Sequence, residues 1–332
     1  MAERVFKPLE LVQAAAVARR YYLDGRTKIE IADEFGLSRF RVARILDRAM
    51  ETGLVKIAID LPAQLDADLS DRLRAAYGLH HAIVVQAADE PEEALRAQLG
   101  EVSAALLTET VVEGDVVGIG WGRTLNAMTA ALRSLAKCTV VQLTGAVGNV
   151  GVAHEPVETV RRVAAVCGGP AYPIYAPLVV DTAQAAEAIR RQPHIAAAFS
   201  QLDRLTVAVV AIGSWDPPNS QLRDALAQPD RQALEAMHVR AEICATLLDD
   251  DGRPVAPELA TRSITISADR LRRVPEVIAV AGGATKARAM RAVMAAGFVT
   301  SLVTNATAAR ILLELAHPTD GDPRERSEPP CA

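Results

Sequence analysis

The stretch that decides the fold is residues 27–49, TKIEIADEFGLSRFRVARILDRA. Thr27 and Glu30 have the spacing of a capping box, in which each side chain caps the backbone N–H of the other residue, so a helix begins just after Thr27. Gly36 can adopt the left-handed conformation that ends a helix, and Ser38 can cap the next one. The stretch therefore predicts two short helices joined by a tight turn.

The second predicted helix has an apolar face and a separate cationic face. The apolar stripe contains Val42, Ile45, Leu46 and Ala49. The cationic stripe contains Arg41, Arg44 and Arg48, at spacing i, i+3, i+7. One face can pack while the other stays free for phosphates and base edges, which predicts a DNA-binding helix-turn-helix. The residues expected to contact DNA are Thr27, Lys28, Ser38, Arg39, Phe40, Arg41, Arg44 and Arg48.

An ordinary amphipathic surface helix with a few arginines is the alternative explanation. Three residues favour DNA binding, because Ala32 is small where the helices cross, Gly36 turns the chain and Val42 is suited to burial. Residues 1–58 contain 11 Lys and Arg and 8 Asp and Glu, a net of +3, which leaves −8 for the rest of a chain whose net charge is −5. A basic head on an acidic body places the nucleic-acid surface on the head.

The chain is long enough for this head and one large domain or two ordinary ones. It has 332 residues, 50% hydrophobic and 4% aromatic, a composition typical of packed helices and buried parallel strands. No apolar run approaches the roughly 20 residues of a membrane span, and residues 1–10 lack the core of a secretion signal. We expect a cytoplasmic protein with no membrane partner. The four scattered cysteines favour buried thiols, and we expect no metal site and no cofactor.

Beyond the head, short runs rich in Val and Ile alternate with alanine-rich helical stretches. The strand-like runs are Ala82–Gln86, Asp115–Gly120, Thr139–Thr144, Leu205–Gly213, Val277–Gly282 and Val299–Val303. Strands that alternate with helices of about 10–15 residues form a parallel sheet with helices on both faces. We therefore predict an α/β protein, in which a small all-α head precedes a doubly wound, mostly parallel α/β domain.

The domain junction is expected near residues 58–66, where the pattern changes. A helix over Leu9–Leu23 would support the helix-turn-helix from behind. Residues 55–61, VKIAIDL, alternate like a strand, and residues 317–332 combine proline, mixed charge and little apolar content, which is typical of disorder. The predicted domains are a DNA-binding domain over residues 1–60, an effector-binding domain over 61–316 and a disordered tail over 317–332.

In an open α/β sheet, ligands bind beside the carboxyl ends of the strands. The loop Gly118–Thr124, GIGWGRT, follows a strand and opens a helix expected over Leu125–Leu135. Its glycines allow backbone N–H groups to converge on an anion at the helix N-terminus, which predicts a phosphate site. A tight turn that binds nothing explains the glycines alone equally well. The loop lacks the nucleotide P-loop pattern, and the next strand ends in Gln142–Thr144 without the acidic residue that a dinucleotide requires.

Three further loops follow strands: Thr144–Gly148, Ala211–Asp216 and Ala281–Lys286. Two glycines precede Lys286, which lies one turn into a helix, although a solvated surface lysine is the commoner state. Glu242 precedes the strand-like run Ile243–Leu248 and could accept hydroxyl groups or lie at a rim. The residues expected to contact an effector are Gly120, Trp121, Gly122, Arg123, Thr124, Gly145, Gly213, Ser214, Glu242, Gly283 and Lys286.

Taken together, these motifs resemble the SorC-type sugar-binding transcriptional regulators, in which a helix-turn-helix precedes a domain related to sugar-phosphate isomerases and deaminases. The matching stretches are ARRYYLDGRTKIEIADEFGLSRFRVARILDRAMETGLVKI, VVGIGWGRTL, VVQLTGAVG, VAVVAIGS, AEICATLLDDDG and VIAVAGGATKARAMRAVMAAGFVTSLVTNATAA. They span nearly the whole chain in the family's order. The resemblance implies that Gly120, Gly122 and Thr124 cradle a phosphate, with Lys286 as its charged partner and Glu242 toward sugar hydroxyls.

The chain departs from the patterns of these relatives in two places. Thr304-Asn305-Ala306 stands where such regulators usually have Thr-Asp-Glu, so two carboxylates are missing near the pocket. The related deaminases carry Asp-Gly-His after their Gly-Ile-Gly loop, whereas residues 214–218 read SWDPP, with no histidine to open a sugar ring. We therefore expect a regulator that is not an enzyme and has no catalytic residues. The alternative is a sugar-phosphate isomerase or deaminase with an accessory nucleic-acid-binding head.

The resemblance implies operator DNA as one partner and a sugar, sugar phosphate or polyol as the other, in control of a carbohydrate transport or catabolism operon. Coupling between two such sites is typically about 1–3 kcal/mol. One head with a net charge of +3 offers few phosphate contacts, whereas two heads roughly 34 Å apart can bind a palindrome. We therefore expect a homo-oligomer, either a dimer or a tetramer.

Overall fold

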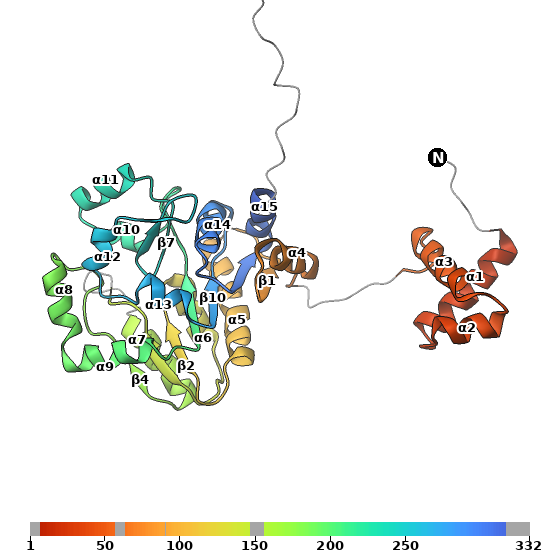
Figure 1. The fold of residues 1–332 in the computed structure, drawn as a ribbon, viewed down its shortest axis with the longest axis horizontal. Coiled ribbons are helices and arrows are strands. Elements are labelled where there is room, and N and C mark those ends of the chain that lie inside the picture. The colour runs from red at the N-terminus through yellow and green to blue at the C-terminus, as the bar shows by residue number, and fades with distance from the viewer. Residues whose placement is uncertain (1–6, 57–63, 90, 147–155, 317–332) are drawn as a thin grey trace, which may run out of the picture. The chain divides into compact units, whose positions relative to one another are not determined.

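A computed structural model describes residues 7–56, 64–89, 91–146 and 156–316. The chain divides into two compact units, residues 1–60 and 61–332 (Figure 1). Each unit has its own hydrophobic core. The expected tail and most of the strand expected over residues 55–61 lie outside the described residues.

Within its described part, the head consists of α1 (Pro8–Tyr22), α2 (Lys28–Phe35) and α3 (Arg39–Glu51). The predicted capping box is present, because the N–H of Thr27 donates to Glu30 Oε2 at 2.8 Å and the N–H of Glu30 donates to Thr27 Oγ1 at 3.3 Å. Gly36 ends α2 with φ 61°. Ser38 Oγ accepts the N–H of Arg41 at 3.2 Å and so caps α3. The local helix signals therefore fixed these boundaries.

The three helices enclose a small apolar core, with α1 against both other helices as expected. Its buried members are Val17, Ala18, Ile31, Ala32, Val42 and Leu46. Ion pairs on the surface also hold α2 in place: Arg20 of α1 and Arg26, which lies between the two helices, bind the two carboxylate oxygens of Glu34 at 2.9 and 2.8 Å. The helix-turn-helix is therefore a fixed scaffold for the outer side of α3.

The second unit is built on a seven-stranded sheet in the order β1-β11-β10-β5-β2-β3-β4, in which every pair is parallel. The strands are β1 (His81–Val85), β2 (Val116–Ile119), β3 (Thr139–Gln142), β4 (Ala171–Tyr172), β5 (Val207–Ala211), β10 (Glu276–Val280) and β11 (Ser301–Asn305). The six predicted strands are confirmed. The seventh, β4, has only two residues and left no hydrophobic run to find.

Helices cover both faces of this sheet, as predicted (Figure 1). In β5, Val207 and Val209 join the core under α5, α6 and α7, whereas Ala208 and Val210 join the opposite core under α4, α14 and α15. Successive side chains of a strand point to opposite faces, so a strand buried on both sides is a continuous apolar run. The helices are α4 (Ala67–Tyr77), α5 (Glu92–Thr110), α6 (Arg123–Ala131), α7 (Pro156–Cys167), α8 (Ala183–Arg190), α9 (Pro193–Leu202), α10 (Gln221–Ala225), α11 (Gln228–Ala236), α12 (Pro257–Thr261), α13 (Ala268–Arg272), α14 (Ala287–Ala295) and α15 (Ala306–Ala316).

A small antiparallel sheet, absent from the prediction, lies beside the large one. Its strands are β6 (Gly213–Ser214), β7 (Ala241–Ile243), β8 (Thr246–Leu248) and β9 (Pro254–Val255). The single strand expected over Ile243–Leu248 is wrong: Cys244 and Ala245, with φ 46° and 60°, turn the chain between β7 and β8. Two-residue turns with positive φ are usually recognised in a sequence by Asn-Gly, and the pair Cys-Ala gives no such signal.

Two boundaries differ from the sequence expectation, and both affect the site. Gly118 belongs to β2 rather than to the following loop. It packs tightly in the core, since an added β-carbon would lie 2.5 Å from Leu143. The helix expected over Leu125–Leu135 is α6, which begins earlier, at Arg123, and ends at Ala131. None of the helices in the described part of the chain is long and apolar enough to cross a membrane.

Candidate functional site

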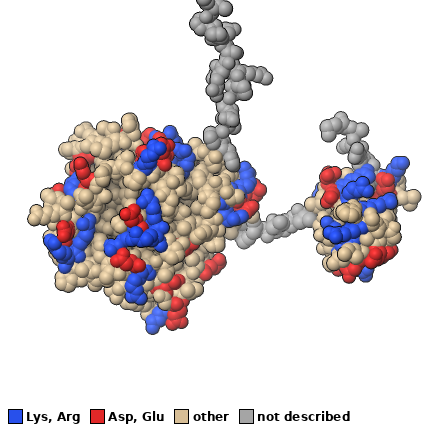
Figure 2. All heavy atoms as spheres, in the orientation of Figure 1, with Lys and Arg blue, Asp and Glu red and all other residues tan. Residues whose placement is uncertain are grey.

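The outer side of the head carries most of the residues expected at DNA. Arg39, Arg41 and Arg44 are exposed along α3, and Phe40 is 79% exposed. Thr27 and Ser38 are the N-caps of α2 and α3, so each places backbone N–H groups at a helix start. Such N–H groups and arginine side chains are the usual donors to phosphate oxygens. The visible face of the head carries both basic and acidic side chains (Figure 2).

Two of the expected cations face other protein groups. Arg48 is half-buried and lies 3.8 Å from Glu10 of α1, so its position differs from that of Arg41 and Arg44 on the same helix. The Lys28 ammonium lies 5.5 Å from the ring centroid of Tyr21, in cation–π geometry. These contacts tie the two side chains to α1.

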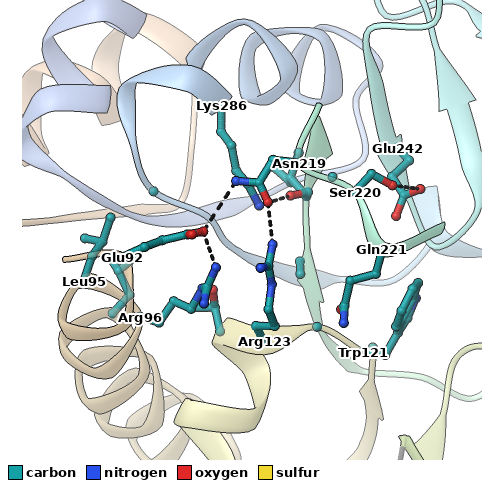
Figure 3. Close-up of a pocket in the computed structure, with 18 of the residues that line it drawn as sticks. Glu92, Leu95, Arg96, Trp121, Arg123, Asn219, Ser220, Gln221, Glu242 and Lys286 are labelled. Atoms are coloured by element: carbon teal, nitrogen blue, oxygen red, sulfur yellow. Dashed lines mark hydrogen bonds and ion pairs between the residues drawn. The ribbon is translucent and has the colours of Figure 1, made fainter. Parts of the chain in front are cut away.

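The pocket lies where the order of the large sheet reverses. β2 and β5 are neighbours, but the chain passes from β2 to β3 on one side and from β5 to β10 on the other. Such a switch point leaves a crevice at the carboxyl ends of the two strands. Here the crevice is lined by the start of α5, the loop after β2, the loop after β5, β7 and the 3₁₀ turn η1 (Ala284–Lys286) (Figure 3).

The loop after β2 presents the N-terminus of α6 to the pocket. Gly122, with φ 145°, is the residue before the helix, and its conformation excludes an ordinary side chain. Gly120 lies so close to β5 that a β-carbon would be 3.1 Å from the carbonyl oxygen of Val209. The first N–H groups of a helix have no partner within it, so α6 offers donors and a partial positive charge at this point.

A polar network crosses the pocket from α6 to α5. Arg123 donates through Nη2 to Asn219 Oδ1 at 2.6 Å, and Asn219 Nδ2 lies 3.5 Å from Glu92 Oε1. Glu92 also pairs with Arg96 one turn further along α5. Partial burial raises the pKa of Glu92. The opposing effect is larger, because the hydrogen bond from Arg96, the charges of Arg96 and Arg123 and the Asn219 amide all lower this pKa, so the net shift is downward. The carboxylate is therefore held ionised among cations.

Lys286 brings a further cation into the pocket from η1. Its ammonium donates to the carbonyl oxygen of Ile212 at 3.0 Å. Burial of the ammonium, together with the charge of Arg123, lowers the pKa of Lys286 to about 8, against the partial compensation of Glu92 and Glu242. A lysine held in this way can bind an anion favourably, because an incoming negative group would stabilise the ionised form of its side chain.

Glu242 lies on the opposite wall, in β7, and is 6% exposed. Its Oε2 accepts the Ser220 hydroxyl at 2.8 Å. Burial raises the pKa of Glu242 to about 7, against the opposing effects of Ser220 and Lys286. Gly213 is required beside it, since an added β-carbon would lie 2.4 Å from Glu242 Cγ. Near neutral pH this side chain can therefore donate or accept a hydrogen bond.

Most of the residues expected to contact an effector line this one pocket. They are Gly120, Trp121, Gly122, Arg123, Thr124, Gly213, Glu242 and Lys286. Three others lie outside its lining: Gly145 packs against the carbonyl oxygen of Pro177, the Ser214 hydroxyl donates to the carbonyl oxygen of Pro217 at 2.7 Å, and Gly283 donates its N–H to Asn305. These three residues shape the neighbouring backbone.

The sequence did not predict the pocket residues of α5, of the loop after β6 or of the start of α10. Glu92, Arg96, Asn219, Ser220 and Gln221 all line the pocket. Arg123 and Asn219 are separated by 96 residues, so only the fold brings them together. A weak signal existed, because Asn219 directly follows residues 214–218, SWDPP, where the chain departs from the pattern of the related deaminases.

Asn305, one of the departures from the relatives' pattern, is not a pocket residue. It is fully buried, accepts the N–H of Gly283 at 2.9 Å and donates to the carbonyl oxygen of Ala87 at 3.1 Å and to Asp89 Oδ1 at 2.6 Å. Asp89 in turn accepts the N–H of Ala284 at 3.1 Å. Asn305 and Asp89 therefore fix the loop that carries Lys286.

Comparison with known proteins places this architecture in a family. Residues 62–314 match the Sugar-bind family, described as "Putative sugar-binding domain". The transcriptional regulator LsrR of Klebsiella pneumoniae subsp. pneumoniae is 30% identical, covering 91% of this chain and 93% of that protein. The sorbitol operon regulator of Klebsiella pneumoniae is 26% identical, covering 90% and 96%.

The likeness extends to three dimensions. The crystal structure of the full-length sorbitol operon regulator SorC from Klebsiella pneumoniae superimposes with a TM-score of 0.71 and 25% identity, over 92% of this chain and 99% of that one. The expected α/β architecture with a helical head is thus shared with a solved regulator. Both the sequence match and the fold support one assignment: the chain belongs to the SorC-type sugar-binding transcriptional regulators.

Proposed function

We propose that this regulator binds operator DNA with an affinity that a phosphorylated sugar controls. The observation that carries the proposal is the convergence of the α6 N-terminus, Arg123 and Lys286 on one pocket at the switch point of the sheet. Backbone N–H groups at a helix start and a guanidinium are the groups that recognise phosphate oxygens. Glu242 and Ser220, which are hydrogen-bonded to each other on the far wall, supply polar groups that can bind sugar hydroxyls.

In this proposal residues 1–60 bind DNA through α3 and residues 61–316 bind the effector, in the cytoplasm. A homo-oligomer, a dimer or a tetramer, presents two heads to a palindromic operator of a carbohydrate transport or catabolism operon. Relatives named the erythritol catabolism regulatory protein EryD of Brucella abortus and the deoxyribonucleoside regulator of Bacillus subtilis support the choice of a sugar-related effector, at 28% and 27% identity.

We further propose that the pocket binds its sugar without turnover. The loop after β5 continues as Ser214–Pro218 without a histidine, and ring opening needs a positioned acid or base. Glu242 and Lys286 have shifted pKa values, which occur in active sites and also in binding pockets. Incubation with aldose, ketose and amino-sugar phosphates, followed by chromatography of the sugars, separates the two roles, because an isomerase would interconvert the aldose and the ketose and a deaminase would release ammonia from the amino sugar.

The main test is DNA binding in the presence of candidate effectors. Fluorescence anisotropy with DNA from upstream of the regulator's own gene is measured against matched sugars and sugar phosphates, for wild type and for Arg123→Met. We expect sugar phosphates to change the apparent Kd and the variant to have lost this response with its basal DNA affinity intact. A response to free polyols alone, or an equal response in Arg123→Met, would contradict the phosphate assignment.

A further inference from the structure

The pocket already contains an anion among its cations. The carboxylate of Glu92, the first residue of α5, points into the space between Arg96, Asn219 and Lys286 (Figure 3). It pairs with Arg96 and shares Asn219 with Arg123, since the two ends of the Asn219 amide contact Glu92 at 3.5 Å and Arg123 at 2.6 Å. An internal carboxylate therefore holds the side chains that a phosphate would require.

The position of Glu92 makes this arrangement reversible. Its side chain is 48% exposed, whereas that of its partner Arg96 is 21% exposed. An exposed ion pair is weak in water and a glutamate has several rotamers, so the carboxylate can turn toward solvent while Arg96 stays in the pocket. A phosphate group brings up to two charges and three acceptor oxygens, more than one carboxylate offers.

We propose that the Glu92 carboxylate occupies the position of the effector's phosphate and that an anionic effector must displace it to bind. This inference rests on the proposed function and adds a specificity rule to it. A neutral polyol cannot replace the carboxylate among the cations, so it leaves Glu92 in place and the network from α5 to α6 intact. A phosphorylated sugar takes over Arg96 and Arg123 and releases the start of α5.

Glu92→Gln tests the inference, and Glu93→Gln is its matched control. Both glutamates lie in the first turn of α5, where an acidic side chain stabilises the helix by interacting with its dipole. Glu93, however, is exposed and is not part of the pocket lining. The two variants lose the same charge from the same helix end. Any difference between them therefore reports the pocket.

The probe is inorganic phosphate, titrated into the full-length protein at constant ionic strength. Trp121 lines the pocket, so its fluorescence can follow binding, and phosphate protection against thermal unfolding gives a second readout. We expect Glu92→Gln to bind phosphate about three- to tenfold more tightly than wild type, because it has lost a weak, partly exposed competitor. Glu93→Gln should match wild type. Arg123→Met should bind phosphate least.

The possible results separate this inference from the function on which it rests. Equal or weaker phosphate binding by Glu92→Gln, with Arg123→Met still the weakest binder, would overturn the displacement alone. In that case Glu92 is a direct ligand or a bystander at an authentic phosphate site. No phosphate binding by any variant, together with no response of DNA binding to sugar phosphates, would overturn both.

Discussion

Lys286→Met offers the sharpest test of the pocket, because removing a residue that we propose to bind the effector should make the protein more stable. The substitution keeps a long unbranched stem and removes the ammonium. Burial and Arg123 lower the pKa of Lys286 from an ordinary 10.5 to about 8. Keeping the group charged in the folded protein therefore disfavours folding by about 3 kcal/mol at neutral pH. Loss of its hydrogen bond to Ile212 gives back about 1 kcal/mol, leaving a net stabilisation of about 2 kcal/mol.

The dependence on pH identifies the cause. The folded pKa lies below the unfolded one, so below pH 8 both states are protonated and the wild type carries the full penalty. Between about pH 8 and 10.5 the folded state loses its proton first, and the free energy of unfolding of the wild type rises. Lys286→Met should lack this rise, so its advantage should shrink as the pH increases.

Urea unfolding followed by tryptophan fluorescence measures the effect, since Trp121 and Trp215 both lie in the second unit. Lys137→Met is the control, because Lys137 is exposed. The same Lys286→Met protein should bind sugar phosphates at least roughly tenfold more weakly, with unchanged basal affinity for DNA. A variant less stable than wild type at pH 7, or one with the same advantage at pH 7 and 9.5, would refute this account of the buried ammonium.

Three further outcomes are expected. Arg41→Ala or Arg44→Ala should weaken operator binding, and a lost phosphate contact should lower the slope of log K against log salt by about one; gel shifts across a salt series measure this, and unchanged binding in both would remove α3 from the interface. Thr27→Ala should destabilise the head by about 1 kcal/mol, seen in the urea unfolding of residues 1–60 by circular dichroism, and no loss would mean that the capping box contributes nothing. Gly100→Ala should destabilise the second unit by at least about 1–3 kcal/mol, because its β-carbon would meet the backbone of Ala127 at 2.7 Å; an unchanged urea midpoint would show that α5 and α6 can move apart.

The sequence alone determined those features that depend on neighbouring residues. The starts of α2 and α3 follow from a side chain that caps an N–H three residues later, and the αL conformation of Gly36 follows from its lack of a β-carbon. The parallel strands could also be predicted from the sequence, because a strand buried on both faces must be apolar at every position, as Val207–Ala211 is. Local chemistry and burial were sufficient for these elements.

The rest depends on contacts between distant segments. The hairpin at Cys244 and Ala245 has the φ values of a turn that favours glycine. Tertiary packing imposes this turn, because neither residue type is typical of such turns. Half of the polar network at the pocket comes from Glu92 and Arg96, in the first turns of α5. In the sequence, these residues have the pattern of an ordinary charged helix start. Periodicity predicts which face of such a helix is buried, but not which loop its first turn meets.

The charges in the pocket favour an anionic effector over a neutral one. Three cations, Arg96, Arg123 and Lys286, face two carboxylates, and one of these, Glu242, has its pKa raised by burial to about 7 and so is partly neutral at physiological pH. Desolvating Lys286 without a counter-charge is unfavourable, as its lowered pKa records. A polyol would bury these cations further and add no charge to offset that penalty. A phosphate would stabilise the ionised form of Lys286 and raise its pKa. A neutral Glu242 could then donate a hydrogen bond to the sugar without repelling the phosphate.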